Sequence, residues 1–341
     1  MTDVSIRPAG DGIWIIAPAG APTVLDGTPE IDTLVLEALG GQLSWGLLAG
    51  QRLPAAVVDD IDSAQEWLWA VYGERVAMAV ADFPGDRDAT FDVSAEPALP
   101  DLAASAWRLG YAHWAARWWP ASTVDGITPL DQRLLDAEIA TLTEACDLLV
   151  DGADAVPPIT TEHTVDMAAR RDDYALAAGS GGDGRAMTLT RGVGGWDWRR
   201  CPPGLIDASE RAVSWELIRE SGANIVRVRV VAAPQVAGEV APRLRPRASV
   251  RTDSGSATDT ALTLAGDTWV GEAAADSVTA VEIYVPGVGI STMPEASAAE
   301  IRRRVRDLAA ARLRRAADTG DTAYDAPLRT EIAAAASDSD F

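Results

Sequence analysis

Cys201 is the residue whose surroundings most suggest a reactive group. It lies in the segment WDWRRCPPG, residues 196–204, where the guanidinium groups of Arg199 and Arg200 would favour the thiolate. Paired with a histidine such as His163, a thiolate could act as a nucleophile. This interpretation predicts a hydrolase or transferase, with a site between an N-terminal domain and a β-sandwich domain, near Cys201 and His163.

A structural interpretation of the same segment competes with the catalytic one. Trp196 and Trp198 precede a Pro-Pro pair, so the two indoles are expected to anchor a rigid loop. Cys146 lies on the apolar side of a predicted helix and is expected to be buried and inert. We therefore treat Trp196, Trp198 and Cys201 as candidate binding residues, and we assign no catalytic residue.

The residue types give little support to metal or cofactor chemistry. The chain has two histidines and two cysteines, and the cysteines show no CxxC spacing, which excludes a three-histidine site and a cysteine-rich zinc site. It contains no lysine, which excludes the phosphate-binding lysine of P-loop proteins and kinases and the amine of Schiff-base enzymes. We expect no metal and no cofactor.

The distribution of charge favours docking over catalysis. The net charge is −22, and residues 1–155 hold 7 arginines against 25 acidic residues. Arginines are concentrated toward the C-terminus, where Arg303, Arg306 and Arg314 are candidate binding residues. They are expected to pair with the acidic N-terminal half, with a second copy or with an acidic partner protein. Nucleic acid is disfavoured as a partner because its phosphates require a positive surface.

The elements that would position these residues begin with a mixed α/β domain over residues 1–155. Short apolar runs at 13–17 and 75–81 predict strands, and the patterns at 29–39 and 62–72 predict helices. These four elements give the domain its mixed α/β character.

Two longer helices are predicted to form an antiparallel hairpin in this domain. The first spans residues 100–119 and carries an aromatic stripe, and the second begins at Thr128-Pro129 with a matching apolar stripe. We expect the two stripes to pack against each other. The aromatic stripe consists of Trp107, Tyr111, Trp114 and Trp118.

Residues 159–290 are predicted to form an antiparallel β-sandwich. Within 225–231 valines alternate with arginines, which is typical of a strand with one solvent-facing side. An Arg-rich amphipathic helix over 291–317 and a mobile acidic tail over 318–341 complete the chain. The candidate strands are 174–178, 187–190, 213–217, 225–232, 247–251, 261–264 and 278–285.

The sequence therefore predicts an α+β multi-domain protein: a mixed α/β N-terminal domain with a helical hairpin, a central antiparallel β-sandwich and a C-terminal helix. No apolar run approaches the roughly 20 residues of a membrane span, and the first ten residues lack a signal-peptide pattern, so we expect a cytoplasmic protein without membrane association. The Ala- and Arg-rich composition is typical of a GC-rich bacterial genome.

The function that these observations favour is that of a non-enzymatic interaction protein. The chain would be an adaptor or accessory subunit of a bacterial multi-protein system. Its partner would be another protein or a second copy, bound through the Arg-rich C-terminal helix.

Overall fold

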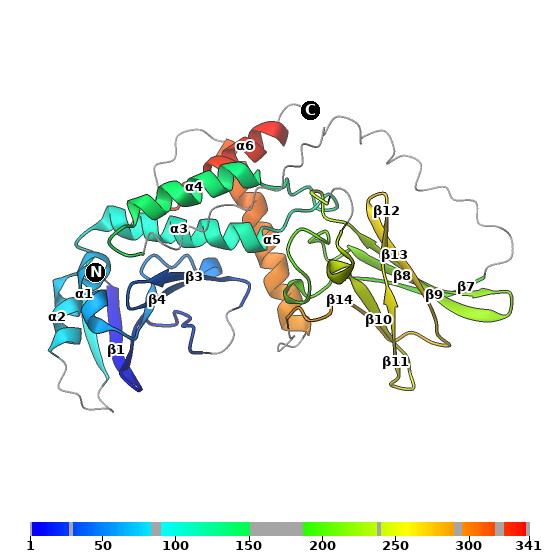
Figure 1. Ribbon diagram of the computed structural model, residues 1–341, viewed down its shortest axis with the longest axis horizontal. Coiled ribbons are helices and arrows are strands. Elements are labelled where there is room, and N and C mark those ends of the chain that lie inside the picture. The colour runs from blue at the N-terminus through cyan, green and yellow to red at the C-terminus, as the bar shows by residue number, and fades with distance from the viewer. Residues whose placement is uncertain are drawn as a thin grey trace. The chain divides into compact units, whose positions relative to one another are not determined.

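The computed structural model describes residues 2–26, 30–82, 90–150, 187–236, 240–289, 295–317 and 324–338. Within these residues it contains six α-helices and three antiparallel sheets (Figure 1). The α+β fold class, with a helix near the C-terminus, is confirmed. None of the helices in the described ranges combines the length and the apolar content that a membrane span requires.

The chain forms two compact units whose segments alternate along the sequence. Unit 1 comprises Met1–Trp119, Leu130–Pro158 and Arg304–Phe341, and unit 2 comprises Pro120–Pro129 and Ile159–Arg303. The sequence suggested one change of domain between residues 155 and 159. Those residues lie outside the described ranges; among the described residues, the short earlier segment Pro120–Pro129 belongs to unit 2, and the C-terminal helix is divided between the units.

Unit 1 contains the strands β1 (Thr2–Gly10), β2 (Ile13–Pro18), β3 (Thr33–Ala38), β4 (Gly41–Gly46), β5 (Ala55–Val58) and β6 (Phe91–Ala95). They form one antiparallel sheet in the order β3-β4-β5-β2-β1-β6. In β1, Val4 and Ile6 are fully buried and alternate with more exposed residues, as a strand with one buried face requires. β5 is buried at every position, which suits its place inside the sheet.

Residues 29–39 were predicted to be helical and contain β3 instead, so this prediction was wrong. Burial alternates with a period of two, with Leu34 and Leu36 on the inner face. The chain then turns at Gly40, which has a φ of 70°, and a Cβ there would lie 2.3 Å from the carbonyl oxygen of Asp60. Only glycine fits such a turn, and it fixes a strand hairpin.

Residues 75–81, predicted as a strand, belong to helix α2 (Glu74–Ala81), which follows α1 (Ile61–Tyr72). The buried residues Val76 and Val80 of α2 are one helical turn apart. A short apolar run is compatible with either a strand or a buried helix, and tertiary packing decides between them. The strand prediction was therefore wrong, whereas the helix at α1 was predicted correctly.

The two longer helices of unit 1 are α3 (Pro100–Trp118) and α4 (Gln132–Ala145), which lie side by side (Figure 1). α4 begins after Asp131, later than predicted, because the Asp131 carboxylate accepts two N–H groups of the first turn. The helices are not joined by a simple hairpin loop, because the intervening Pro120–Pro129 belongs to unit 2.

Unit 2 contains the strands β7 (Met187–Gly194), β8 (Val213–Glu220), β9 (Ala223–Val231), β10 (Arg247–Arg251), β11 (Ala257–Ala261), β12 (Thr263–Ala265), β13 (Thr268–Ala274) and β14 (Ala280–Tyr284). One sheet has the order β12-β13-β9-β8-β7 and the other has the order β11-β10-β14. As the alternation predicted, Val226, Val228 and Val230 of β9 are fully buried. β13 was not predicted, and the candidate strand at 174–178 lies outside the described residues.

The predicted C-terminal helix is present as α5 (Glu295–Ala317). The division between the units falls inside it, between Arg303 and Arg304. Its first residues therefore belong to unit 2 and the remainder belongs to unit 1.

Of the predicted mobile acidic tail, 318–341, the structure describes residues 324–338. Residues 324–338, here called the C-terminal segment, contain helix α6 (Arg329–Asp338) and bury Leu328 and Glu331 completely. Composition alone indicated a tail, because the segment is rich in alanine and aspartate. It is held instead by buried polar partners elsewhere in unit 1, which composition cannot reveal.

Candidate functional site

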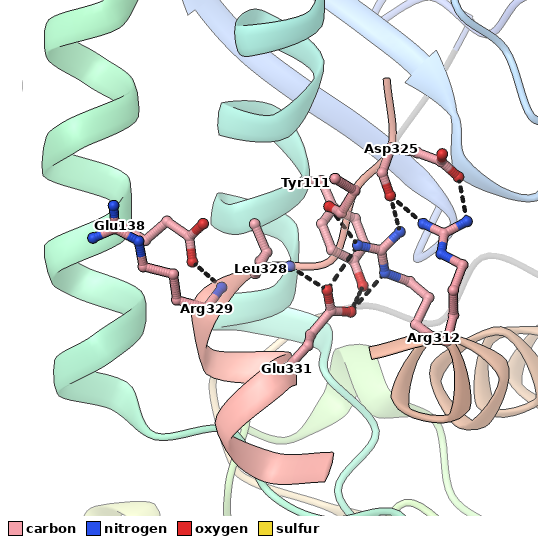
Figure 2. A network of polar contacts seen from close by, with 9 residues as sticks. Tyr111, Glu138, Arg312, Asp325, Leu328, Arg329 and Glu331 are labelled. Atoms are coloured by element: carbon pink, nitrogen blue, oxygen red, sulfur yellow. Dashed lines mark hydrogen bonds and ion pairs between the residues drawn. The ribbon is translucent and has the colours of Figure 1, made fainter. Parts of the chain in front are cut away.

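The candidate site is a buried cluster of charged and aromatic side chains in unit 1, where the C-terminal segment contacts α3, α4 and α5 (Figure 2). In the part of the chain that the structure describes, no three His, Cys, Asp or Glu side chains are grouped to hold a metal ion. The charged side chains of the cluster form ion pairs.

α3 supplies the aromatic surface of the site. Trp107 stacks on Tyr111 with ring centroids 5.3 Å apart, and Tyr111 stacks on Trp114 at 5.5 Å. All three rings are buried. Tyr324 of the C-terminal segment lies against Trp107, with ring centroids 5.8 Å apart. Trp107 and Tyr111 of the stripe thus contact the C-terminal segment, which the sequence did not suggest, and the Trp114 Nε1–H donates to the backbone carbonyl of Ile31 at 2.6 Å.

Arg312 and Glu331 form a bidentate ion pair at the centre of the cluster. The Arg312 Nε–H and Nη2–H groups donate to the two Glu331 carboxylate oxygens at 2.6 and 2.7 Å. Both side chains are buried, Glu331 completely. The Tyr111 hydroxyl donates to the same carboxylate at 2.8 Å, and the Arg312 guanidinium lies 4.1 Å from the centre of the Tyr111 ring. Such a bidentate, charge-assisted pair is among the stronger polar contacts in proteins.

The surroundings of Tyr111 and Arg312 shift the pKa values of both side chains upward. Burial, followed by the Glu331 charge, raises the pKa of Tyr111 well above its usual value, so the phenol stays protonated and donates. Burial alone would lower the pKa of Arg312, but Tyr111 and Glu331 raise it overall. Arg312 therefore remains charged at every accessible pH.

A second contact joins the C-terminal segment to α3 and α4. Glu138 accepts the backbone N–H of Arg329 at 2.7 Å and the Arg108 Nη2–H at 3.0 Å. Burial raises the pKa of Glu138 above its usual range. The Thr330 hydroxyl also donates to the backbone carbonyl of Asp131 at 3.1 Å. The beginning of α6 is thus fixed to the beginning of α4.

A third contact involves the turn that precedes α6. Arg315 forms an ion pair with Asp325 at 2.9 Å. Burial would raise the pKa of Asp325, but the hydrogen bond and the charge of Arg315 lower it overall. The Tyr324 hydroxyl donates to the backbone carbonyl of Ala103 at 3.0 Å. We use the term acceptor face for the residues that hold the segment: Arg108, Tyr111, Glu138, Arg312 and Arg315.

The acceptor face contacts a segment of this chain that carries two paired carboxylates, Asp325 and Glu331. Its central groups, Tyr111 and Arg312, are buried beneath the C-terminal segment, and their polar atoms face a carboxylate of this chain. The sequence carried one local signal of this role that was not recognised. Glu331 is at the third helical position of α6 and accepts the N–H of Leu328 at 2.7 Å, which is half of a capping box.

The three arginines selected from the sequence do not form one exposed surface. Arg303 is exposed and pairs along the helix with Glu300 at 2.6 Å. Arg306 is buried, and Arg314 is exposed. The arginine content of α5 did indicate ion pairing, but it did not indicate which arginines point inward.

Arg302 lies in the part of α5 that belongs to unit 2, and it forms a buried ion pair there. Its side chain is 1% exposed and donates to both carboxylate oxygens of Glu210, at 2.7 and 3.0 Å. From the sequence, arginines of this helix were expected to pair within the chain, with a second copy or with a partner. Arg302, Arg312 and Arg315 pair within the chain.

The residues around Cys201 form a buried loop. Trp196 and Trp198 are buried, and the Trp196 Nε1–H donates to the backbone carbonyl of Asp207 at 2.8 Å. Cys201 is 3% exposed, and burial raises its pKa to about 12. His163, the proposed partner of the thiol, lies outside the described residues.

Asp207 is a buried residue that was not a candidate on sequence grounds. It is fully buried, and its carboxylate accepts the Ser122 hydroxyl at 2.7 Å, the Thr123 N–H at 2.7 Å and the Ser209 N–H at 2.9 Å. These bonds fasten the loop Pro120–Pro129 to the rest of unit 2. No local pattern around Asp207 reveals this, because Ser122 and Thr123 are far away in the sequence.

β7 presents an apolar edge in unit 2. It is the last strand of its five-stranded sheet, and on its other side no strand of the described residues pairs with it. Met187, Leu189 and Val193 are 58%, 39% and 67% exposed. The sequence predicted a strand here but did not predict that it lies at an edge.

Comparison with known proteins does not assign a function to this site. The chain matches no protein family model, no curated protein and no solved structure.

Proposed function

We propose that the protein is a non-enzymatic interaction protein, an adaptor or accessory subunit that binds another protein chain. The observation that carries this proposal is the apolar edge of β7, which pairs with no further strand of the described residues and has exposed side chains. As part of the same proposal, the protein acts in a bacterial cytoplasm within a multi-protein system, a setting suggested by its lysine-free, Ala- and Arg-rich composition.

The physical argument concerns how proteins normally treat an edge strand. An edge exposes N–H and C=O groups that can pair with another chain, and proteins usually protect it with charges, proline or bulges. β7 has one irregularity of register, between Thr188 and Thr190, but it has no proline, and Arg191 is its single charged residue. An extended segment of a partner would add to this edge as a further strand and cover Met187 and Val193.

The enzymatic alternative, a hydrolase or transferase near Cys201 and His163, receives no support from the geometry of Cys201. A buried thiol with a pKa of about 12 has very little thiolate at neutral pH. The titratable groups of the acceptor face are likewise engaged in holding the C-terminal segment.

The experiment places charges on the edge of β7. The variant Leu189→Lys/Val193→Lys changes two exposed side chains, so we expect the fold to be kept. Proteins that copurify with the wild-type chain from its source cells should be reduced at least about tenfold, a loss of about 1.4 kcal/mol in binding. Quantitative mass spectrometry measures this loss.

The matched control is Met78→Lys/Leu134→Lys, which places the same charges on exposed apolar residues outside β7. This control should retain the copurifying proteins. The proposal is wrong if the edge variant keeps them while its circular dichroism spectrum is native, or if the control loses the same proteins.

A further inference from the structure

The C-terminal segment contacts the acceptor face as a ligand contacts a binding site. Three of its residues provide the main polar anchors: Asp325, Arg329 through its backbone, and Glu331. The segment buries one large aliphatic side chain completely, that of Leu328, and its other fully or nearly buried residues are small or polar. Its attachment therefore depends on charge and hydrogen bonding more than on apolar area.

Attachment through ion pairs and hydrogen bonds favours a segment that can dissociate from the acceptor face. A buried ion pair is often no more stabilising than apolar side chains of the same size, so its advantage is specificity. Once detached, the segment would expose two large side chains, Leu328 and Tyr324, and its carboxylates would be hydrated.

The charges at this contact favour a second copy of the chain as the partner in such an exchange. The chain has a net charge of −22, so two copies repel each other at long range. At this contact the signs are opposite, because the segment presents Asp325 and Glu331 to Arg315 and Arg312. Every copy carries both the C-terminal segment and the acceptor face. Two copies related by a two-fold axis could therefore each bind the segment of the other.

We propose that the acceptor face also binds the C-terminal segment of a second copy of this chain, in a reciprocal exchange that forms a dimer. The site is distinct from the edge of β7, and this inference does not depend on the function proposed for that edge. In the dimer, Glu331 of each copy would accept hydrogen bonds from Tyr111 and Arg312 of the other.

Two charge-reversal variants test the exchange. Arg312→Glu reverses the charge on the acceptor face and leaves the C-terminal segment unchanged. Glu331→Arg reverses the charge on the segment and leaves the acceptor face unchanged. Each variant alone should be monomeric, because neither can form the central pair. In a dimer of one copy of each variant, Arg312 pairs with Glu331 at one site, and at the other site the two substituted residues form the reversed pair. The mixture should therefore form dimers of twice the 35.9 kDa chain mass.

The control is the double variant Arg312→Glu/Glu331→Arg, which carries both halves of the reversed pair. A heterodimer of this variant with either single variant would contain one contact between like charges, so adding a single variant should give no additional dimer. Size-exclusion chromatography with light scattering measures the masses. We expect the dimer fraction of the mixture to exceed that of either single variant at least about tenfold. Adding Leu189→Lys/Val193→Lys to both chains should leave this result unchanged, which separates it from pairing at β7.

A mixture that stays monomeric overturns the exchange, because the segment is then held only within its own chain. Equal dimerisation of each variant alone also overturns it, because the contact is then a different one. If charge reversal disturbs the circular dichroism spectrum, the pair Arg312→Gln and Glu331→Gln makes the same test. Their mixture restores the natural Arg312–Glu331 contact at one of the two sites.

Discussion

Arg312 and Glu331 form a buried ion pair in which each charge compensates the desolvation cost of the other. Each is costly to bury alone, and the bidentate contact together with the Tyr111 hydroxyl offsets that cost. Removing one partner leaves the other as an unpaired buried charge, whereas removing both does not.

We expect Arg312→Met to lower the free energy of unfolding of unit 1 by about 3–5 kcal/mol. Arg314→Met, an exposed position on the same helix, should change it by less than about 0.5 kcal/mol. The double variant Arg312→Met/Glu331→Met should lose less than Arg312→Met alone. Urea unfolding followed by tryptophan fluorescence measures all three, and equal losses for Arg312→Met and Arg314→Met would contradict the assigned role of the pair.

The cysteines give a second prediction at the scale of residues. Burial raises the pKa of both Cys146 and Cys201 to about 12, so at pH 8 only about one thiol in ten thousand is ionised. The thiolate is the reactive form, and we expect iodoacetamide to label neither residue of the native chain on the time scale that labels the urea-unfolded chain completely. Intact-mass spectrometry reads the labelling, and rapid native labelling of Cys201 would revive the enzymatic interpretation.

At the scale of elements, the edge strand β7 depends on a glycine that an aromatic ring covers. A Cβ at Gly192 would lie 2.5 Å from two carbon atoms of the Trp215 ring on β8. The ring therefore packs directly on the backbone of β7 at this position. At Gly194, by contrast, a Cβ would meet no atom within 4 Å.

This difference predicts the effect of adding one methyl group. Gly192→Ala should push Trp215 out of place and cost about 1–3 kcal/mol, seen as faster hydrogen exchange of the β7 amides and altered near-ultraviolet circular dichroism. Gly194→Ala, the matched substitution in the same strand, should stay within about 0.5 kcal/mol of the wild type. If both variants exchange at the same rate, the Trp215 contact does not hold the strand.

At the scale of the whole molecule, the two units are not separate stretches of sequence. Pro120–Pro129 belongs to unit 2, although the segments on either side of it belong to unit 1. Its Ser122 and Thr123 supply most of the donors that satisfy the buried Asp207 carboxylate. Unit 2 therefore requires a loop that lies outside its main stretch of sequence.

A fragment of residues 159–303 should consequently be less stable than unit 2 in the intact chain. Without Ser122 and Thr123, the Asp207 carboxylate loses buried hydrogen bonds at a cost of about 3 kcal/mol or more. Joining 120–129 to 159–303 through a glycine-serine linker should recover most of that loss. Urea midpoints compare the two fragments, and equal midpoints would show that the loop is dispensable.

The sequence by itself determined the elements whose patterns are local. The alternating valines of β9 and the aromatic stripe of α3 predicted these elements correctly, because periodicity reports directly which side chains face the core. The α+β class followed from such elements. The burial of Cys146, Trp196 and Trp198 was also expected from their neighbours in the sequence.

Only the tertiary structure decided the features that depend on distant partners. The strand β3 and the helix α2 have short apolar runs whose periodicity is ambiguous, so packing selected their form. Asp207 and Glu331 became buried anchors because Thr123 and Arg312, far away or on another element, supply their hydrogen bonds. A carboxylate in a sequence looks the same whether it will be hydrated or buried, since its burial is favourable only when the fold brings donors to it.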